Sequence, residues 1–418
     1  MRLLVIIAII AALTMPVRAA EKITIDQLEQ MIARHAVQPQ PVKHEANSPG
    51  EIPDLKDSDL LQQPGGVDDM VLQVAGLELS QRLSTTTMFR VIWKYHLGVK
   101  MQQALEQLSD RTALLKLPEN EEPRLPAPDP AAQEGMLKSA RAYVLQVLSH
   151  LPDFMATQTT TRFDDAPPQM KYWQATTAPG LHRVGFVQRQ ITFRDGKEVT
   201  EGGRNPADAK FQAGALESRG EFGTEAAVVA MDVKEGAISF SHWEETMTGP
   251  AAVYQYDVPR GSSHYEVNYE CGGRRIFHDT PAYHGTIAVD PKTGAVFRMT
   301  LEAESKPDDP VSHVASVIEY GPVVLGHQRS ICPLRSLAFM VDEADACSER
   351  GHKLHRPVKM INQTIFSNYH RFGTSSTIIF NEAESGNTRR NTLSDRPQAG
   401  SEDRVAGKPA TSGQSRRP

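Results

Sequence analysis

Cysteine is scarce in this chain, whose 418 residues include only Cys271, Cys332 and Cys347. No two of them form a CxxC pair, so the sequence supports neither a thioredoxin-type redox motif nor a ribbon-type metal site. In an oxidising compartment two cysteines can pair, and the short loop between Cys332 and Cys347 favours a disulfide between these two. A link from Cys332 to Cys271 and three buried free thiols are the alternatives.

Long apolar runs are also missing. The run Leu3–Met15 has thirteen residues, too few to cross a hydrocarbon core of about 30 Å. It follows Met1-Arg2 and precedes Val17-Arg18-Ala19, which is the three-part layout of a secretory signal. We therefore expect residues 1–19 to be a cleaved signal peptide, the mature chain to be periplasmic or secreted, and no transmembrane segment to remain in it.

The sequence has no block of Lys or Arg, and its formal net charge is −6. Loss of residues 1–19 would remove Arg2 and Arg18 and no acidic residue, which leaves −8 on the mature chain. A mildly acidic chain without a basic block is a poor candidate for binding nucleic acid or an anionic membrane. We expect no nucleic-acid partner.

Familiar catalytic templates are absent too. The sequence contains no GxSxG, HExxH, Walker loop, GxGxxG or EF-hand loop. Lys292-Thr293-Gly294 matches one motif of penicillin-recognising serine enzymes, but the SxxK and SDN motifs that accompany it there are missing. We therefore assign no catalytic residue, no metal ligand and no cofactor, and a protein without enzymatic activity is favoured.

The first third of the chain has the apolar period of helices. Leu28, Met31 and Ile32 share one face of a helix over residues 23–35, and a second helix is expected from Asp68 or Asp69 to about Leu83. Two further helices are predicted, one from the stripe Leu97, Met101, Leu105 and Leu108, the other from Asp129 as N-cap and Pro130 at the first helical position.

From about Phe154 the apolar period becomes two. In the segment 296–304, Phe297, Met299, Leu301 and Ala303 alternate with polar residues, which is typical of an antiparallel strand with one buried face. The turn Asp290–Gly294 joins it to a strand at 284–289. With roughly ten to twelve such strands, the sequence predicts an α+β fold: a helical N-terminal region, then a large antiparallel β-sheet, for which a half-open barrel around a helix is one arrangement.

The predicted domain organisation follows the changes in composition and period. It comprises a signal peptide (1–19), a short helix (20–35), a Pro-rich flexible linker (36–66), a helical region (67–117), a Pro-rich linker (118–129), a helix plus antiparallel β domain (130–382) and a disordered tail (383–418).

Aromatic residues gather in the middle of the β region and are the candidate ligand-binding residues. An apolar cleft could be lined by Trp243, Tyr254, Tyr256, Tyr265, Tyr269 and Tyr283. Ordinary packing in a core is the alternative interpretation of the same residues.

Histidines offer a second candidate site. Zinc could in principle be bound by His242, His264, His278, His284 and His313, but none of them has tight ligand spacing. His242 and Glu244 would point to the same side of a strand, since side chains alternate along it, and they could act as an acid–base pair.

Several segments, in order, resemble a family of uncharacterised exported bacterial proteins. They are Leu77–Ser84, Leu151–Phe154, Ala156–Phe163, Gly220–Gly223, Ser241–Glu244, Ser263–Val267, Tyr283–Gly285, Val289–Pro291, Tyr320–Pro322, Ile331–Pro333 and Tyr369–His370. The resemblance spans roughly residues 70–380 and implies no catalytic residue. The hairpin of the form strand–Asp-Pro-x-x-Gly–strand is also similar in architecture to periplasmic lipoprotein carriers and their sensor relatives, which implies a half-open barrel.

Three functions remain open at the level of sequence. The favoured one is an exported binding or carrier protein that holds an apolar or amphipathic, lipid-like ligand. The alternatives are a hydrolase that uses His242 with Glu244 or a histidine metal site, and an envelope scaffold whose helical region docks an envelope protein.

Overall fold

The computed structural model describes residues 22–36, 66–146, 151–166, 181–199, 216, 220–233, 237–246, 248–271, 274–343 and 357–371. The chain divides into two units, residues 1–373 and 374–418, and all described residues belong to the first. The predicted signal peptide, residues 37–65 of the predicted linker and the predicted tail lie outside the described residues. What we predicted for these segments therefore stays a prediction.

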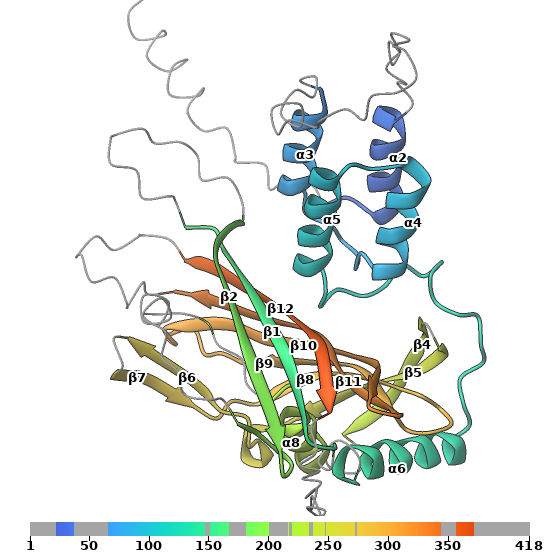
Figure 1. The fold of residues 1–418 in the computed structure, drawn as a ribbon, viewed down its shortest axis with the longest axis vertical. Coiled ribbons are helices and arrows are strands. Elements are labelled where there is room, and N and C mark those ends of the chain that lie inside the picture. Colours follow the sequence, from blue (N-terminus) through green and yellow to red (C-terminus); the bar gives the residue numbers. More distant parts are fainter. Residues whose placement is uncertain are drawn as a thin grey trace, which may run out of the picture. The chain divides into compact units, whose positions relative to one another are not determined.

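An N-terminal helical bundle is built from α2 (Ile25–Ala36), α3 (Gly66–Gly76), α4 (Thr85–Tyr95) and α5 (Val99–Arg111) (Figure 1). Its core contains the predicted stripe, because Met101, Leu105 and Leu108 are buried against apolar side chains of the other three helices. Since each helix is short, this shared apolar core rather than helix propensity holds the bundle together.

The second predicted helix ends earlier than the sequence indicated. Helix α3 stops at Gly76 rather than near Leu83, and Leu79 forms a parallel bridge with Ile23 instead. Glycine is a poor helix residue, and the bridge holds the following segment extended. Ser84 then caps α4, because its hydroxyl accepts a hydrogen bond from the Thr87 N–H at 3.1 Å.

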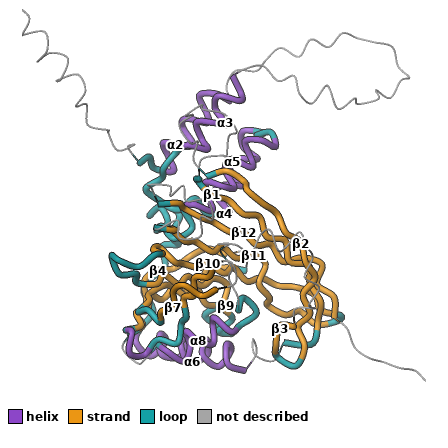
Figure 2. Tube along the Cα trace, turned by 90° about the vertical axis from the view of Figure 1, so that its left-hand side faces the viewer, coloured by secondary structure: helices purple, strands orange, loops and turns teal. Residues whose placement is uncertain are grey.

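Two more helices pack on one face of the β-sheet (Figures 1 and 2). Helix α6 (Pro130–Gln146) begins as predicted, with the Asp129 carboxylate accepting from the Ala132 N–H at 2.8 Å. Helix α8 (Thr224–Asp232) was not predicted from the sequence. We call the sheet surface beneath α6 and α8 the core face, and the opposite surface the pocket face.

The large sheet has ten strands in the order β3-β2-β1-β12-β11-β10-β9-β8-β5-β4. Their bounds are β1 (Phe154–Asp164), β2 (His182–Arg194), β3 (Lys197–Val199), β4 (Ile238–Thr246), β5 (Gly249–Val258), β8 (Tyr283–Val289), β9 (Val296–Ala303), β10 (Val311–Leu325), β11 (Gln328–Asp342) and β12 (Val358–Arg371). All neighbouring strands run antiparallel. The edge strands β3 and β4 do not pair with each other, so the sheet is open and the predicted α+β class is confirmed.

A short 3₁₀ helix, η3 (Arg260–Ser262), leads from β5 to a separate two-stranded sheet. That sheet consists of β6 (Val267–Cys271) and β7 (Arg274–Asp279). Only the second half of the alternating segment 264–271 is therefore a strand.

Strand β9 contains a β-bulge that the alternating sequence pattern did not indicate. The pairing with β8 skips Phe297, and an extra residue of this kind changes which face the following side chains occupy. Met299 and Leu301 are buried on the core face, whereas Phe297 packs against Val253 in a different apolar cluster. The prediction that Phe297 shares a face with Met299 and Leu301 is wrong.

Candidate functional site

A pocket of about 490 Å³ lies on the pocket face of the sheet. The loop that follows α5, residues 113–117 together with Glu122, forms one wall, and strands β4, β5, β8 and β9 form the floor. We call it the sheet pocket. It joins residues that are far apart in the sequence, since its wall comes from the helical region and its floor from the β region.

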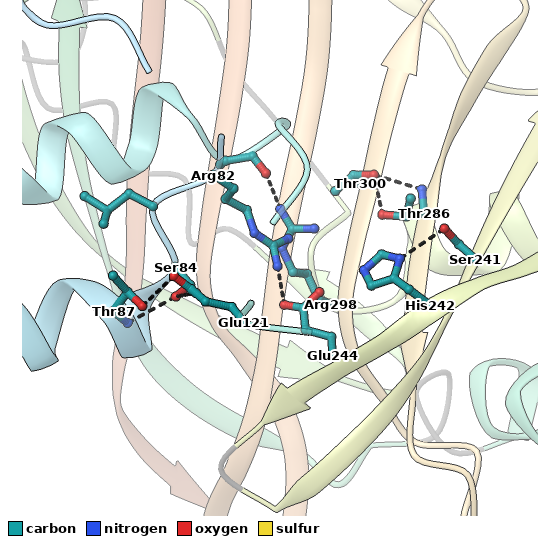
Figure 3. A network of polar contacts seen from close by, with 12 residues as sticks. Arg82, Ser84, Thr87, Glu121, Ser241, His242, Glu244, Thr286, Arg298 and Thr300 are labelled. Atoms are coloured by element: carbon teal, nitrogen blue, oxygen red, sulfur yellow. Dashed lines mark hydrogen bonds and ion pairs between the residues drawn. The ribbon is translucent and has the colours of Figure 1, made fainter. Parts of the chain in front are cut away.

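Hydrogen bonds fix the wall of the sheet pocket. The Glu121 carboxylate accepts from the hydroxyls of Ser84 and Thr87, each at 2.7 Å (Figure 3). The Arg82 N–H donates to the Lys116 carbonyl at 2.8 Å. The loop is therefore tied at two points to the segment that begins α4, and a ligand would meet a wall that is already ordered.

Cross-strand pairing sets polar side chains in rows across the floor. The two rows are Gln255–Thr286–Thr300 and Asp257–His284–Glu302. Residues two apart on a strand are about 7 Å apart, so the rows lie side by side on the same face. Within the first row the hydroxyls of Thr286 and Thr300 are 2.9 Å apart (Figure 3).

The inner end of the pocket is charged and nearly closed to solvent. Arg82 forms an ion pair with Glu244, and their side chains are only 10% and 16% exposed. The Arg298 guanidinium donates to the Ala113 carbonyl (Figure 3). Burial alone would raise the pKa of Glu244, but the guanidiniums of Arg82 and Arg298 outweigh it and lower the pKa. Burial, aided by the neighbouring Arg82, lowers the pKa of Arg298 to about 10.

These shifts leave Glu244 and Arg298 charged at neutral pH, because neither pKa crosses that range. The contacts of Arg82 and Arg298 also join the bundle side of the pocket to its strands. The inner end is thus both a polar surface for a ligand and a structural joint.

His242 lies beside this charged end, on β4. Its Nδ1 is 3.0 Å from the Ser241 hydroxyl, and both residues line the pocket (Figure 3). Burial lowers the pKa of His242, although the carboxylates of Glu122 and Glu244 oppose that shift. The imidazole is consequently neutral at pH 7 and has a lone pair available.

Five of the six predicted aromatic residues belong to the apolar core on the core face or pack against it. Tyr256 and Tyr283 are almost fully buried on the core face, where Tyr265 approaches Tyr283 with ring centres 5.8 Å apart. Their hydroxyls have internal partners: Tyr256 donates to the Thr300 carbonyl at 2.6 Å and Tyr283 to Asp232 at 2.9 Å.

Of the remaining three aromatic residues, Tyr254 belongs to the same core, Trp243 packs against it, and Tyr269 lies elsewhere. Trp243 and Tyr254 both contact Phe240, while Tyr269 belongs to a separate apolar cluster. Of the six predicted residues, Tyr256 alone contributes to the sheet pocket. A role for the other five in ligand binding stays a prediction.

The five candidate histidines are dispersed. His242 and His284 line the sheet pocket, whereas His264 contacts Asp232, His278 contacts Asn268, and His313 lies on β10. Among the residues that the structure describes, no three His, Cys, Asp or Glu side chains are grouped as metal ligands.

Cys332 is buried on the core face, where burial raises the pKa of its thiol to about 12. Cys347 lies outside the described residues, so its predicted disulfide with Cys332 stays a prediction. A link to Cys271 has no support from the topology, because β6 pairs with β7 while the neighbours of β11 are β10 and β12.

Arg82, Arg298 and the loop 113–117 are the site residues that sequence reasoning missed. Arg298, Thr300 and Glu302 alternate with the apolar side of β9, a pattern that indicates a water-facing side. The cover over them comes from a loop far away in the sequence. The one local signal is the position of two leucines, Leu114 and Leu115, directly after the end of a helix.

Comparisons with known proteins place this fold only loosely. No protein-family model and no curated protein matches the sequence. An outer membrane lipoprotein-sorting protein domain from Vibrio parahaemolyticus is similar at 10% identity and a TM-score of 0.21, covering 59% of this chain and 95% of that domain. A DUF1329 family protein from Desulfovibrio piger is similar at 8% identity and a TM-score of 0.24, covering 58% of this chain and 94% of that chain.

The first of these structures is by its name a lipoprotein-sorting protein domain, and the Asp-Pro-x-x-Gly hairpin is similar in architecture to lipoprotein carriers. At such TM-scores neither structure bears on function, which has to be argued from the residues of this chain. Within the described residues, no helix is both long and apolar enough to span a membrane.

Proposed function

We propose that this chain is an exported, non-enzymatic protein that binds an amphipathic molecule in the sheet pocket. The observation that carries the proposal is the contrast between the two sides of that pocket. The wall presents Leu114, Leu115 and Leu117, while the floor presents hydroxyl, amide and charged groups. Polar groups placed beside an apolar wall fix the orientation of a small ligand.

The same contrast sets how the ligand would lie. Its apolar part packs against the leucines of the loop and against Val253 of the floor. Its polar group meets the row formed by Asp257, His284 and Glu302, where hydrogen bonds replace those to water. A volume of about 490 Å³ suits one small amphiphile rather than a folded partner.

The test is a blocking substitution in the floor. Gln255 is exposed and lines the pocket, so Gln255→Trp would fill the space with a side chain that strands accept. Binding of a dansyl-labelled long-chain amine, whose ammonium group can meet the carboxylates of Asp257 and Glu302, is followed by its fluorescence. It should weaken at least about tenfold, which corresponds to about 1.4 kcal/mol. Gln190→Trp, on an exposed position of β2 that does not line the pocket, is the matched control.

Equal binding by the Gln255→Trp and Gln190→Trp variants would overturn the proposal. The proposal would also fail if Gln255→Trp bound the probe normally while Tyr283→Phe lost binding. That pair of results would indicate that the ligand binds on the core face. Export has its own test: N-terminal sequencing of native protein should find Ala20, within two residues, and an intact Met1 would contradict it.

A hydrolase is the second candidate, and the contact between Ser241 and His242 is the observation that favours it. A neutral imidazole 3.0 Å from a hydroxyl can accept its proton and make the serine oxygen a nucleophile. In that case Ser241→Ala and His242→Ala would each abolish hydrolysis of a p-nitrophenyl ester by the purified protein. Activity that survives both substitutions, or is absent from the unaltered chain, would rule this candidate out.

A further inference from the structure

The outer side of α4 exposes two aromatic side chains. Phe89 is 50% exposed and Trp93 is 75% exposed. They are four residues apart, so they lie one above the other on the same helix face. The inner side of the same helix is buried through Met88, Val91 and Ile92. The side chains of Phe89 and Trp93 therefore do not contribute to the bundle core.

Basic residues lie directly beside these aromatics. Arg90 and Lys94 follow Phe89 and Trp93 by one position each, and both are exposed. From Ser84 to Leu105 the chain contains Arg90, Lys94 and Lys100 but no acidic residue. This stretch is positively charged within a chain whose net charge is −6.

One acidic residue of a neighbouring helix offsets part of this charge. Glu29 of α2 forms ion pairs with Arg90 and Lys94, each at 2.8 Å. Arg90 and Lys94 together with Glu29 leave one positive charge in excess on this part of α4. Exposed ion pairs of this kind are weak, so both cations can also interact with negative charges outside the protein.

Among the described residues, Phe89 and Trp93 belong to none of the apolar clusters. Arg82, just before α4, forms an ion pair with a strand of the sheet, as does Asp110, at the end of α5. Eleven helical residues extend over about 16 Å, so Trp93 lies toward the end of α4 remote from those contacts. The sheet pocket is lined from the opposite end.

We propose that this α4 patch, defined as Phe89, Arg90, Trp93 and Lys94, binds the surface of an anionic lipid bilayer. The aromatic rings enter the interface between headgroups and acyl chains, and the two cations face lipid phosphates. A bilayer interface is favoured over a protein partner because the patch is the convex side of one helix. A tryptophan there needs no preformed pocket in lipid, where its ring is buried while its N–H stays hydrated.

The net charge of the whole sequence does not indicate this membrane-binding patch. Net charge excludes membranes only for a uniform surface, whereas attraction to an anionic bilayer acts within about one Debye length, about 8 Å at physiological salt. Groups farther away contribute little. The acidic remainder of the chain would then orient the molecule, so that the α4 patch approaches the membrane first.

The experiment is sedimentation of the processed chain, purified after export, with vesicles of phosphatidylglycerol and phosphatidylcholine. The bound fraction should be at least about tenfold higher than with phosphatidylcholine alone, and high salt should release the protein. Trp93→Ser should abolish binding. Phe186→Ser, which removes an exposed phenylalanine of β2, should leave it unchanged.

Glu29→Gln tests the charge argument from the other direction. Removing this acidic group should strengthen vesicle binding about fivefold, the effect of one charge near an anionic surface. The proposal is overturned if the processed chain does not bind anionic vesicles, if Trp93→Ser binds as well as the unaltered chain, or if Phe186→Ser loses binding equally. A different outcome is that the unaltered chain self-associates but does not bind vesicles, and that Trp93→Ser makes it monomeric. This result would identify the patch as a protein–protein contact instead.

Discussion

At the scale of single residues, neighbours on β9 lie in opposite surroundings. Leu301 is fully buried beneath α6 and α8, whereas Glu302 belongs to the floor of the sheet pocket. A charge placed at the first position has no partner and no water. A side chain of opposite charge at Glu302 would still be in contact with water.

Leu301→Asp should therefore prevent the β region from folding, and Glu302→Lys should change the free energy of unfolding by no more than about 0.5 kcal/mol. Denaturant unfolding followed by circular dichroism measures both. Similar losses in the two variants would contradict the period-two assignment of this strand.

Glu225 provides a pH dependence at the same scale. It is fully enclosed on the core face, where Ser316 donates a hydrogen bond to its carboxyl group, and burial raises its pKa to about 7. The unfolded chain ionises this group at about pH 4.5. The neutral acid thus stabilises the folded state below pH 4.5, and that stabilisation is lost as the pH rises to 7.

Between pH 4.5 and 7 the contribution of Glu225 to the free energy of unfolding should fall by on the order of 3 kcal/mol. Glu225→Gln cannot ionise and should lack this part of the pH dependence. Urea titrations of both proteins across that range give the difference, in which all other titrating groups cancel. Parallel curves for the two proteins would show that Glu225 is not the group responsible.

At the scale of elements, β5, β8 and β9 pass unusually close to one another at Gly285. A Cβ at this position would overlap the Thr300 carbonyl and lie 2.7 Å from the Tyr256 hydroxyl. That hydroxyl in turn donates to the Thr300 carbonyl at 2.6 Å. The glycine therefore leaves the space in which a buried tyrosine ties two strands together.

Gly285→Ala should lower the free energy of unfolding by about 1–3 kcal/mol, the usual cost of overpacking. Gly135→Ala is the control, because its Cβ meets nothing within 4 Å and an alanine inside α6 should stabilise by about 0.5–1 kcal/mol. Thermal unfolding of both variants tests the contrast. If the melting temperatures of both variants shifted in the same direction, the close approach of Thr300 and Tyr256 to Gly285 would be refuted.

At the scale of the molecule, ion pairs link the bundle region to the sheet. Arg82 pairs with Glu244, and Asp110 pairs with Arg335 while also accepting from Gln363 at 2.9 Å. Removing one member of such a buried pair leaves a charge with neither partner nor water. These links therefore determine whether the wall and floor of the sheet pocket stay together.

Arg82→Met should lower the free energy of unfolding by about 3–5 kcal/mol, because Glu244 would be left unpaired. The double variant Arg82→Met with Glu244→Gln should recover much of that loss. A full double-mutant cycle by denaturant unfolding measures the coupling. Additive losses would mean that the two side chains do not interact.

Much of the fold follows from local pattern. The helices that begin at Ile25 and Pro130, and the hairpin from β8 to β9 through Gly294, have their capping, turn and apolar signals in neighbouring residues. Helix α8 and the early end of α3 were missed. In both cases contacts with distant segments, the sheet for α8 and Ile23 for α3, decide the outcome.

The candidate site divides in the same way. The sequence alone determined the α+β class and a β region whose strands alternate between an apolar and a polar side, because period and turn chemistry are local properties of the chain. Only the tertiary structure decided which surfaces those sides meet. It buried most of the predicted tyrosines beneath α6 and α8, and it laid the loop 113–117 over the polar side of β9. Such contacts join segments far apart in the sequence, and no local spacing records which distant segment will cover a given face.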